Sequence, residues 1–399
     1  MLKKLFVQKK IHRHIWILGF VSLLTDTASK IIQSLLPLFL VSVLGANLVT
    51  VGTIEGIAEA TASIVKMFSG ALSDYWGRRK ELAIAGYGLS ALIIPIFALA
   101  NSPLWVLIGR FGDRLGKGIR VAPRNALIAD VTSPENRGVA YGLRQSLDTI
   151  GAAIGPLLAV ILMYSLNQNF RLVFLLTTIP GIFAVALLFF GIKENDSYQK
   201  ANARNLNWGS LKNLDRGYWL LLAVILIFNL GNSSDAFLLL RSQQVGIDNT
   251  LIPLSFMVMN FTYFLSAYPS GTISDHVGRY GLILTSFLLY TLVYLGFALA
   301  QAPWQIWILF ACYGLYLGMN KGLLLAAISD RVPSELRGTA FGIIALFTGI
   351  CLLPANLIAG LLWDKISYQA PFFFGSIMAI VAALLFITSR EDSEGRARN

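Results

Sequence analysis

Long apolar stretches separated by short polar connections run through the whole chain. About 20 consecutive apolar residues suffice to cross the hydrocarbon core of a bilayer as a helix. The pattern therefore predicts twelve membrane-spanning helices, centred in the stretches 15–43, 49–74, 81–100, 103–127, 138–164, 170–191, 218–244, 251–274, 280–300, 303–328, 338–362 and 369–388. We expect an all-α integral membrane protein.

The composition supports a membrane protein and argues against an enzyme. Only 13% of the 399 residues are charged and the mean hydropathy is +0.66, whereas a soluble fold of this size needs a larger polar surface. Cys312 and Cys351 lie far apart in apolar stretches, and His12, His14 and His276 lie at the N-terminus or in a short loop. We therefore expect no metal site, no cofactor and no intramembrane catalytic centre.

The net charge of +11 is explained best as a signal of orientation. Basic residues gather in the connections on one side, including Arg78, Arg79, Lys80 and Arg137, while "GANLVT", "ANSP" and "GIDNT" on the other side have none. By the positive-inside rule, both termini are expected in the cytoplasm. No basic patch with interleaved aromatics suggests nucleic-acid binding. The basic N-terminus lacks a cleavage pattern and is expected to be retained.

The chain divides into two related halves. The longest polar interval, 193–217, separates six predicted helices from six. "GALSDYWGRR" (70–79) is echoed by "GTISDHVGRY" (271–280), and "ADVTSPENRGVAYG" (129–142) is echoed by "SDRVPSELRGTAFG" (329–342). We expect two pseudo-symmetric six-helix bundles, 1–192 and 218–399 with a short cytoplasmic tail, joined by a cytoplasmic linker at 193–217.

Three short motifs resemble those of the major facilitator superfamily, and the resemblance covers essentially the whole chain. "GALSDYWGRRK" resembles its loop between helices 2 and 3, with Tyr75 in place of a basic residue. "RLGKGIRVA" resembles its helix 4 motif, and "GAAIGP" resembles more weakly a helix 5 motif of exporters and antiporters. The resemblance implies a secondary transporter that works by alternating access.

The loop motifs supply candidate gating residues. Asp74 and Asp275 can meet the positive end of a neighbouring helix, and Gly77 and Gly278 permit a tight turn. The resemblance implies that such contacts close the cytoplasmic side in one transport state. The candidate gating set is Asp74, Gly77, Arg78, Asp130, Arg137, Asp275, Gly278 and Arg279, with a charge network expected among Arg78, Asp130 and Arg137. The alternative is that the basic residues only anchor the topology.

One helix carries an unusual stripe of charge. At roughly 100° per residue, six side chains fall within an arc of about 120°: Arg110, Asp113, Arg114, Lys117, Arg120 and Arg124. Each charge near the bilayer centre costs about 2.5–3.5 kcal/mol, so the stripe must face protein or water. The last three basic residues can instead extend toward the cytoplasmic surface.

Other helices of the first half offer charged partners for this stripe. These are Asp26 and Lys30 on one helix, Glu55, Glu59 and Lys66 on the next, and Arg144 with Asp148 on the fifth. The second half offers only Asp235, Arg241 and Lys321, and Lys30 and Asp235 are expected to line a central cavity. The surplus of basic residues suggests an anionic group on the substrate. The alternative is that these charges pair and stiffen the bundle.

The leading hypothesis is a secondary active transporter of a small organic solute in the cytoplasmic membrane. Proton-coupled export through Asp26, Glu59 or Asp113 is favoured, with Arg114 holding an anionic group and a monomer expected. The alternatives are uptake of an organic anion, such as a siderophore or carboxylate metabolite, and a receptor without transport. Arg114 can also be purely structural, paired with Glu59 or Asp113.

Overall fold

The computed structural model describes residues 12–76, 78–133, 136–192, 215–332 and 336–396, and every regular element within these ranges is an α-helix. In the first half, the helices are α1 (Arg13–Ser42), α2 (Leu48–Trp76), α3 (Arg79–Leu99), α4 (Pro103–Asp130), α5 (Arg137–Ser165), α6 (Phe170–Leu176) and α7 (Thr178–Gly191). In the second half, they are α8 (Arg216–Gly231), α9 (Asp235–Gln244), α10 (Ile252–Val277), α11 (Arg279–Leu299), α12 (Pro303–Arg331), α13 (Arg337–Lys365) and α14 (Ala370–Arg396). The all-α expectation is confirmed.

Two of the membrane spans are interrupted. α6 and α7 are separated at Thr177, and α8 and α9 are separated by residues 232–234. Counting each of these pairs once, nine spans in the described part of the chain are apolar and long enough to cross a bilayer. α4, α10 and α12, with 28, 26 and 29 residues, bring the number of long crossings to the expected twelve.

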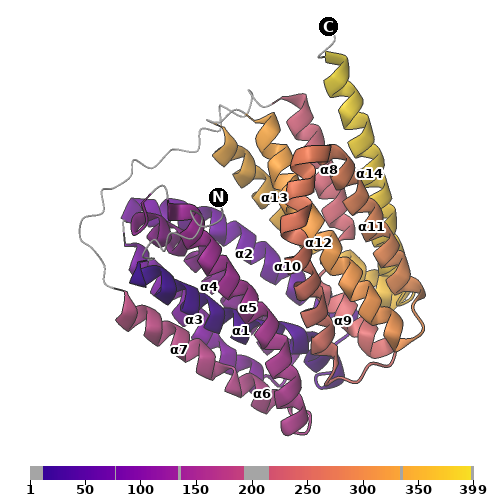
Figure 1. Cartoon of the computed structure of the whole chain (residues 1–399). Coiled ribbons are helices and arrows are strands. Elements are labelled where there is room, and N and C mark those ends of the chain that lie inside the picture. The colour runs from indigo at the N-terminus through magenta and orange to yellow at the C-terminus, as the bar shows by residue number, and fades with distance from the viewer. Residues whose placement is uncertain (1–11, 77, 134–135, 193–214, 333–335, 397–399) are drawn as a thin grey trace, which may run out of the picture.

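The helices form two groups that converge at one end (Figure 1). α1–α7 lie together, as do α8–α14, and the two groups diverge toward the end that holds the start of α1, the end of α7, the start of α8 and the end of α14. At the opposite end α1 meets α9, and α2 packs along α13. We call this opposite end the closed end.

Small residues allow the close packing of α2 on α13. A Cβ added at Gly360 of α13 would lie 2.5 Å from the carbonyl oxygen of Leu48, and one added at Gly52 of α2 would collide with the carbonyl of Asn356. A side chain at either position would push the two backbones apart. Nearby, the Gln243 side chain of α9 donates a 2.8 Å hydrogen bond to Ser42 of α1.

Candidate functional site

The charged stripe of α4 faces the interior of the first bundle. Arg110, Arg114 and Arg120 are 2%, 5% and 4% exposed, while Ile108 and Phe111 on the opposite side of the helix are exposed. An apolar face toward lipid and a charged face toward protein is the arrangement that the cost of intramembrane charge requires. The expected inward orientation is confirmed for these three arginines.

Two carboxylates of α2 pair with two arginines of the stripe. The Arg110 guanidinium lies 2.5 Å from the Glu55 carboxylate, and both side chains are buried. The Arg114 guanidinium lies 3.1 Å from Glu59 and 4.0 Å from Asp113. Buried charges need such partners, because an isolated charge loses its hydration without compensation. In this state Arg114 is thus paired with acidic residues, which is the arrangement expected if its role is structural.

The later residues of the stripe bind polar groups of other helices. Arg120 donates a 2.5 Å hydrogen bond to Ser90 of α3 and stacks 4.8 Å above the ring of Tyr87. Arg124 donates to Ser22 and to the Tyr87 hydroxyl, at 3.3 Å and 3.4 Å. The expectation that Arg120 extends to the membrane surface is wrong, because Ser90 and Tyr87 hold its guanidinium inside the bundle.

On α5, Arg144 forms an ion pair with Asp148 one turn later. A second nitrogen of Arg144 donates a 3.0 Å hydrogen bond to Gln145. The other carboxylate oxygen of Asp148 is buried with no hydrogen-bond partner among the described atoms. This pair is local to one helix and stabilises α5.

A small cavity opens inside the first bundle, between α1, α3, α4 and α7. Its volume of about 60 Å³ holds a few water molecules and not an organic solute. Its charged lining residues are Asp26, Lys30, Arg110, Asp113, Arg114, Lys117 and Arg120. The sequence analysis singled out all of these charged residues, and the cavity that they line lies within the first bundle. Their role in substrate binding or coupling stays a prediction.

Asp26 and Lys117 differ from the other charges of the cavity. Among the residues that the structure describes, neither has an ion-pair partner within 4.0 Å. Asp26 is half-buried on α1, and Lys117 is exposed on α4. A carboxylate and an amine that lie outside the ion pairs of their neighbours can change protonation without breaking such a pair.

Lys30 connects this cavity to the second bundle. Its amine donates a 3.0 Å hydrogen bond to Gln33 and lies 4.7 Å from the ring centroid of Phe256 on α10. Phe256 is fully buried. The contact places a cation of the cavity directly against the other half of the molecule. Lys66, by contrast, is exposed on α2 and does not line the cavity.

Tyrosines fill the corresponding region of the second bundle. Tyr290 and Tyr294 of α11 stack at 4.0 Å between centroids, and Tyr313 and Tyr316 of α12 stack at 5.5 Å. All four are buried. Tyr313 lies about 200 residues after Asp113, the offset that relates the two halves. The equivalent position is therefore acidic in the first half and aromatic in the second. The i,i+4 and i,i+3 spacings of these tyrosines are visible in the sequence, but the sequence analysis did not single out the cluster.

The charged residues of the second half lie apart from the cavity. Asp235, in the first turn of α9, accepts a 3.2 Å hydrogen bond from the Tyr313 hydroxyl. Arg241 donates to the carbonyls of Phe297 and Ala300 at the end of α11, at 3.0 Å and 2.6 Å. Asp235 contacts Tyr313 in the second bundle and is not among the residues that line the small cavity, so a central cavity shared by Lys30 and Asp235 stays a prediction.

The loop after α2 differs in one respect from the expected charge network. Arg79, not Arg78, forms the ion pair with Asp130, because Arg79 begins α3 beside the end of α4. Arg78 lies 3.3 Å from Glu81 in an exposed pair. Arg137 is exposed and has no ion pair with a residue in the described ranges. Among the residues that the structure describes, Asp130 is therefore paired with Arg79 and not with Arg78 or Arg137.

The remaining gating residues are only partly described. Gly278 has a φ of +93° and ends α10, so it makes the expected tight turn before Arg279 starts α11. Gly77 and the side chains of Asp74, Asp275 and Lys321 lie outside the described part of the chain.

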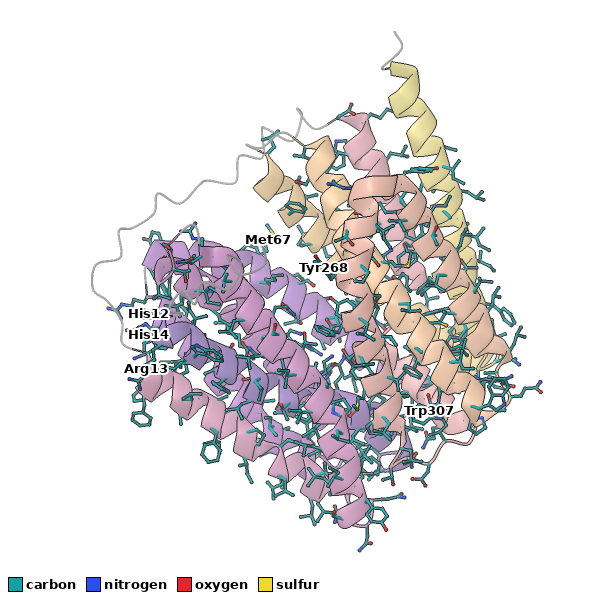
Figure 2. All side chains as sticks on the ribbon, viewed as in Figure 1. His12, Arg13, His14, Met67, Tyr268 and Trp307 are labelled. Atoms are coloured by element: carbon teal, nitrogen blue, oxygen red, sulfur yellow. The ribbon has the colours of Figure 1, made fainter. Side chains whose placement is uncertain are left out.

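Figure 2 shows the region where the two bundles diverge, with Met67 of α2 and Tyr268 of α10 beside it. Tyr268 is 79% exposed. An aromatic side chain so exposed at the edge of the diverging region has room for contact with a solute or with lipid.

Comparisons with known proteins agree with this architecture. The model of a family described as Major Facilitator Superfamily matches residues 18–354 and 236–399. An uncharacterized MFS-type transporter of Methanocaldococcus jannaschii is 32% identical over 385 residues, 95% of each chain. Multidrug resistance protein MdtG of Salmonella arizonae is 24% identical, over 92% of this chain and 91% of its own. The crystal structure of the nucleoside transporter NupG superposes with a TM-score of 0.79 at 13% identity, over 94% of this chain and 99% of that one.

Proposed function

The chain belongs to the Major Facilitator Superfamily and is a multi-pass membrane transporter, and from that premise we propose that it exports a small organic solute in exchange for protons. In this proposal the halves 1–192 and 218–399, joined by the linker 193–217, rock against each other around a central site, so that the route opens alternately to the two sides.

The observation that carries the proposal is the position of Asp26. This carboxylate lines the small cavity inside the first bundle and has no ion pair among the described residues. Glu59 and Asp113, the other candidates for proton coupling, both lie beside Arg114. Protonating either of them would weaken a buried ion pair, which costs free energy. Asp26 can take up and release a proton without that penalty, so we assign the coupling to it.

The solute itself binds outside the small cavity. A volume of about 60 Å³ is too small for a whole organic molecule, so in this proposal the solute presents only one group to the cavity. Lys117 and Lys30 are positioned to receive an anionic group. Arg114 joins them only if that group displaces Glu59 from the guanidinium. The positive surplus also makes uptake of an organic anion the second candidate function.

We place the protein in the cytoplasmic membrane as a monomer, with both termini in the cytoplasm. The concentration of Arg78, Arg79, Lys80 and Arg137 in the connections of one predicted side supports this orientation. The end where the bundles diverge then faces the cytoplasm, and the closed end faces outward. Asp74 and Asp275 are proposed to stabilise the opposite state, in which the cytoplasmic side is closed, whereas the Arg79–Asp130 pair joins α3 to α4 within the first half in the state described here.

Everted membrane vesicles test this function. Respiration acidifies their interior, and a fluorescent dye reports the pH gradient while solutes are added outside. Because one relative is a multidrug resistance protein, the panel includes the cation ethidium, the anion benzoate and the neutral nucleoside uridine. The proposal expects at least one solute to dissipate the gradient in wild-type vesicles and not in Asp26→Asn vesicles. Transport that persists at full rate after the gradient is collapsed would exclude proton coupling.

A further inference from the structure

The closed end is held by an acid that belongs to neither the stripe nor the loop motifs. Asp364 lies near the end of α13, and its two carboxylate oxygens accept hydrogen bonds from the backbone N–H groups of Leu48 and Val49, at 3.1 Å and 2.8 Å. These N–H groups begin α2, in the other half of the chain. We propose that Asp364 is a latch that stabilises closure of this end and so sets the balance between the two transport states.

The start of α2 needs acceptors that its own chain supplies only in part. The first N–H groups of a helix have no partner within the helix, and a negative charge there is favoured. Asn47, directly before α2, accepts a 2.9 Å hydrogen bond from the N–H of Thr50. The N–H groups of Leu48 and Val49 are satisfied by Asp364 instead. The cap of α2 is therefore divided between the two halves of the molecule.

This division makes the contact reversible. Both hydrogen bonds lie at the exposed surface, so water can replace Asp364 when the halves separate, and no buried charge is left behind. The bonds consequently favour closure by a modest amount and do not lock it. The backbone contact of Gly360 with Leu48 and the hydrogen bond of Gln243 to Ser42 close the same joint.

The latch acts on the conformational equilibrium and not on the chemistry of the cavity. Weakening it shifts the population toward the state that opens at this end, by the free energy that the two hydrogen bonds contribute only while the end is closed. This proposal holds for any transported solute and any coupling ion. Its test uses neither.

Disulfide formation at the closed end measures the closed population. In a variant without native cysteines (Cys312→Ser, Cys351→Ser), Ser42→Cys and Gln243→Cys replace the two residues whose side chains are 2.8 Å apart. The cross-linking rate with copper phenanthroline is measured in membranes. Asp364→Ala is expected to slow it by up to about fivefold, the factor by which a favourable charge at a helix N-terminus changes the closing equilibrium. Asp364→Asn should lie in between, because its amide oxygen carries no charge.

A second variant removes the latch from the other side. Leu48→Pro deletes one donor at the first position of α2, where proline is well tolerated. It should also slow cross-linking, and combining it with Asp364→Ala should add little, because both changes break the same contact. The matched control is Asn169→Ala, which removes the N-cap of α6 within one half and should leave the rate unchanged.

The latch is overturned if neither Asp364→Ala nor Leu48→Pro changes the cross-linking rate, or if Asn169→Ala slows it equally. Melting temperatures of the purified variants verify that each is folded. If Asp364→Ala fails to fold, the comparison of Asp364→Asn with Leu48→Pro decides the question by the same rates.

Discussion

The Arg110 guanidinium and the Glu55 carboxylate form an ion pair between α4 and α2, with an N···O distance of 2.5 Å and both side chains almost fully buried. It joins the charged stripe to the helix that packs on the second half. Removing one partner leaves the other charged and buried, which costs about 3–5 kcal/mol.

Arg110→Met is therefore expected to lower the melting temperature sharply, and Arg110→Met with Glu55→Gln to recover most of the loss. The measurement is thermal unfolding of the detergent-purified protein. Equal melting temperatures for wild type and the single variant would contradict the burial of this pair.

Substitutions at Arg114 distinguish a structural role of this residue from a role in solute binding. Its partner Glu59 lies 3.1 Å away. We expect Arg114→Ala to lose stability and transport, and Arg114→Ala with Glu59→Gln to regain stability without transport, because the solute has lost its bidentate donor. Arg114→Lys should bind the solute more weakly despite its charge. If the double variant transports normally, Arg114 is only part of the scaffold.

Arg79 and Arg78 are adjacent arginines in different surroundings. Arg79 pairs with Asp130 across two helices, whereas Arg78 pairs with Glu81 at the exposed surface. Arg79→Gln should reduce the transport rate severalfold, because it breaks the ion pair that holds the start of α3 against the end of α4. Arg78→Gln, the matched control, should change it little. Equal effects of the two substitutions in vesicle transport assays would contradict a role of the Arg79–Asp130 pair in transport.

The sequence also predicts a gating role for Asp74. Asp74→Asn should impair transport while leaving expression near normal, because its charge biases a conformational equilibrium more than the fold. Wild-type rates with unchanged accessibility at both ends of the transporter would remove this residue from the gate.

The orientation in the membrane is tested separately. A single cysteine at position 205, in the linker, should be unreactive toward an impermeant maleimide in intact cells and reactive in everted vesicles. Labelling from outside would reverse the topology, and with it the assignment of the cytoplasmic side.

The inward orientation of the charged stripe could be predicted from the sequence, because the cost of placing charge in lipid determines it. Arg110 and Arg114 had to face inward whatever the neighbours were, because lipid cannot solvate them. Their choice of partner depended on how α2 is rotated against α4, and a single sequence does not contain that rotation. Arg120 was placed wrongly because Ser90 and Tyr87, which hold it, lie on another helix.

The features that join distant parts of the chain escaped prediction entirely. Asp364 meets the start of α2 across more than 300 residues of sequence, and only the packing of α13 along α2 brings them together. The contact of Lys30 with Phe256, where the two halves meet, was not predicted either. Polar residues at a predicted helix end are too common to identify a latch.

The central claim is that Asp26 couples proton movement to export, and proton flux in proteoliposomes tests it most directly. Purified transporter is reconstituted with a pH-sensitive dye inside, and a gradient of the solute identified in vesicles is imposed without any other driving force. The account predicts that solute moving outward drives protons inward in the wild type, and that Asp26→Asn abolishes the proton flux while still binding the solute. Undiminished proton flux in Asp26→Asn, or protons moving in the same direction as the solute, would contradict it.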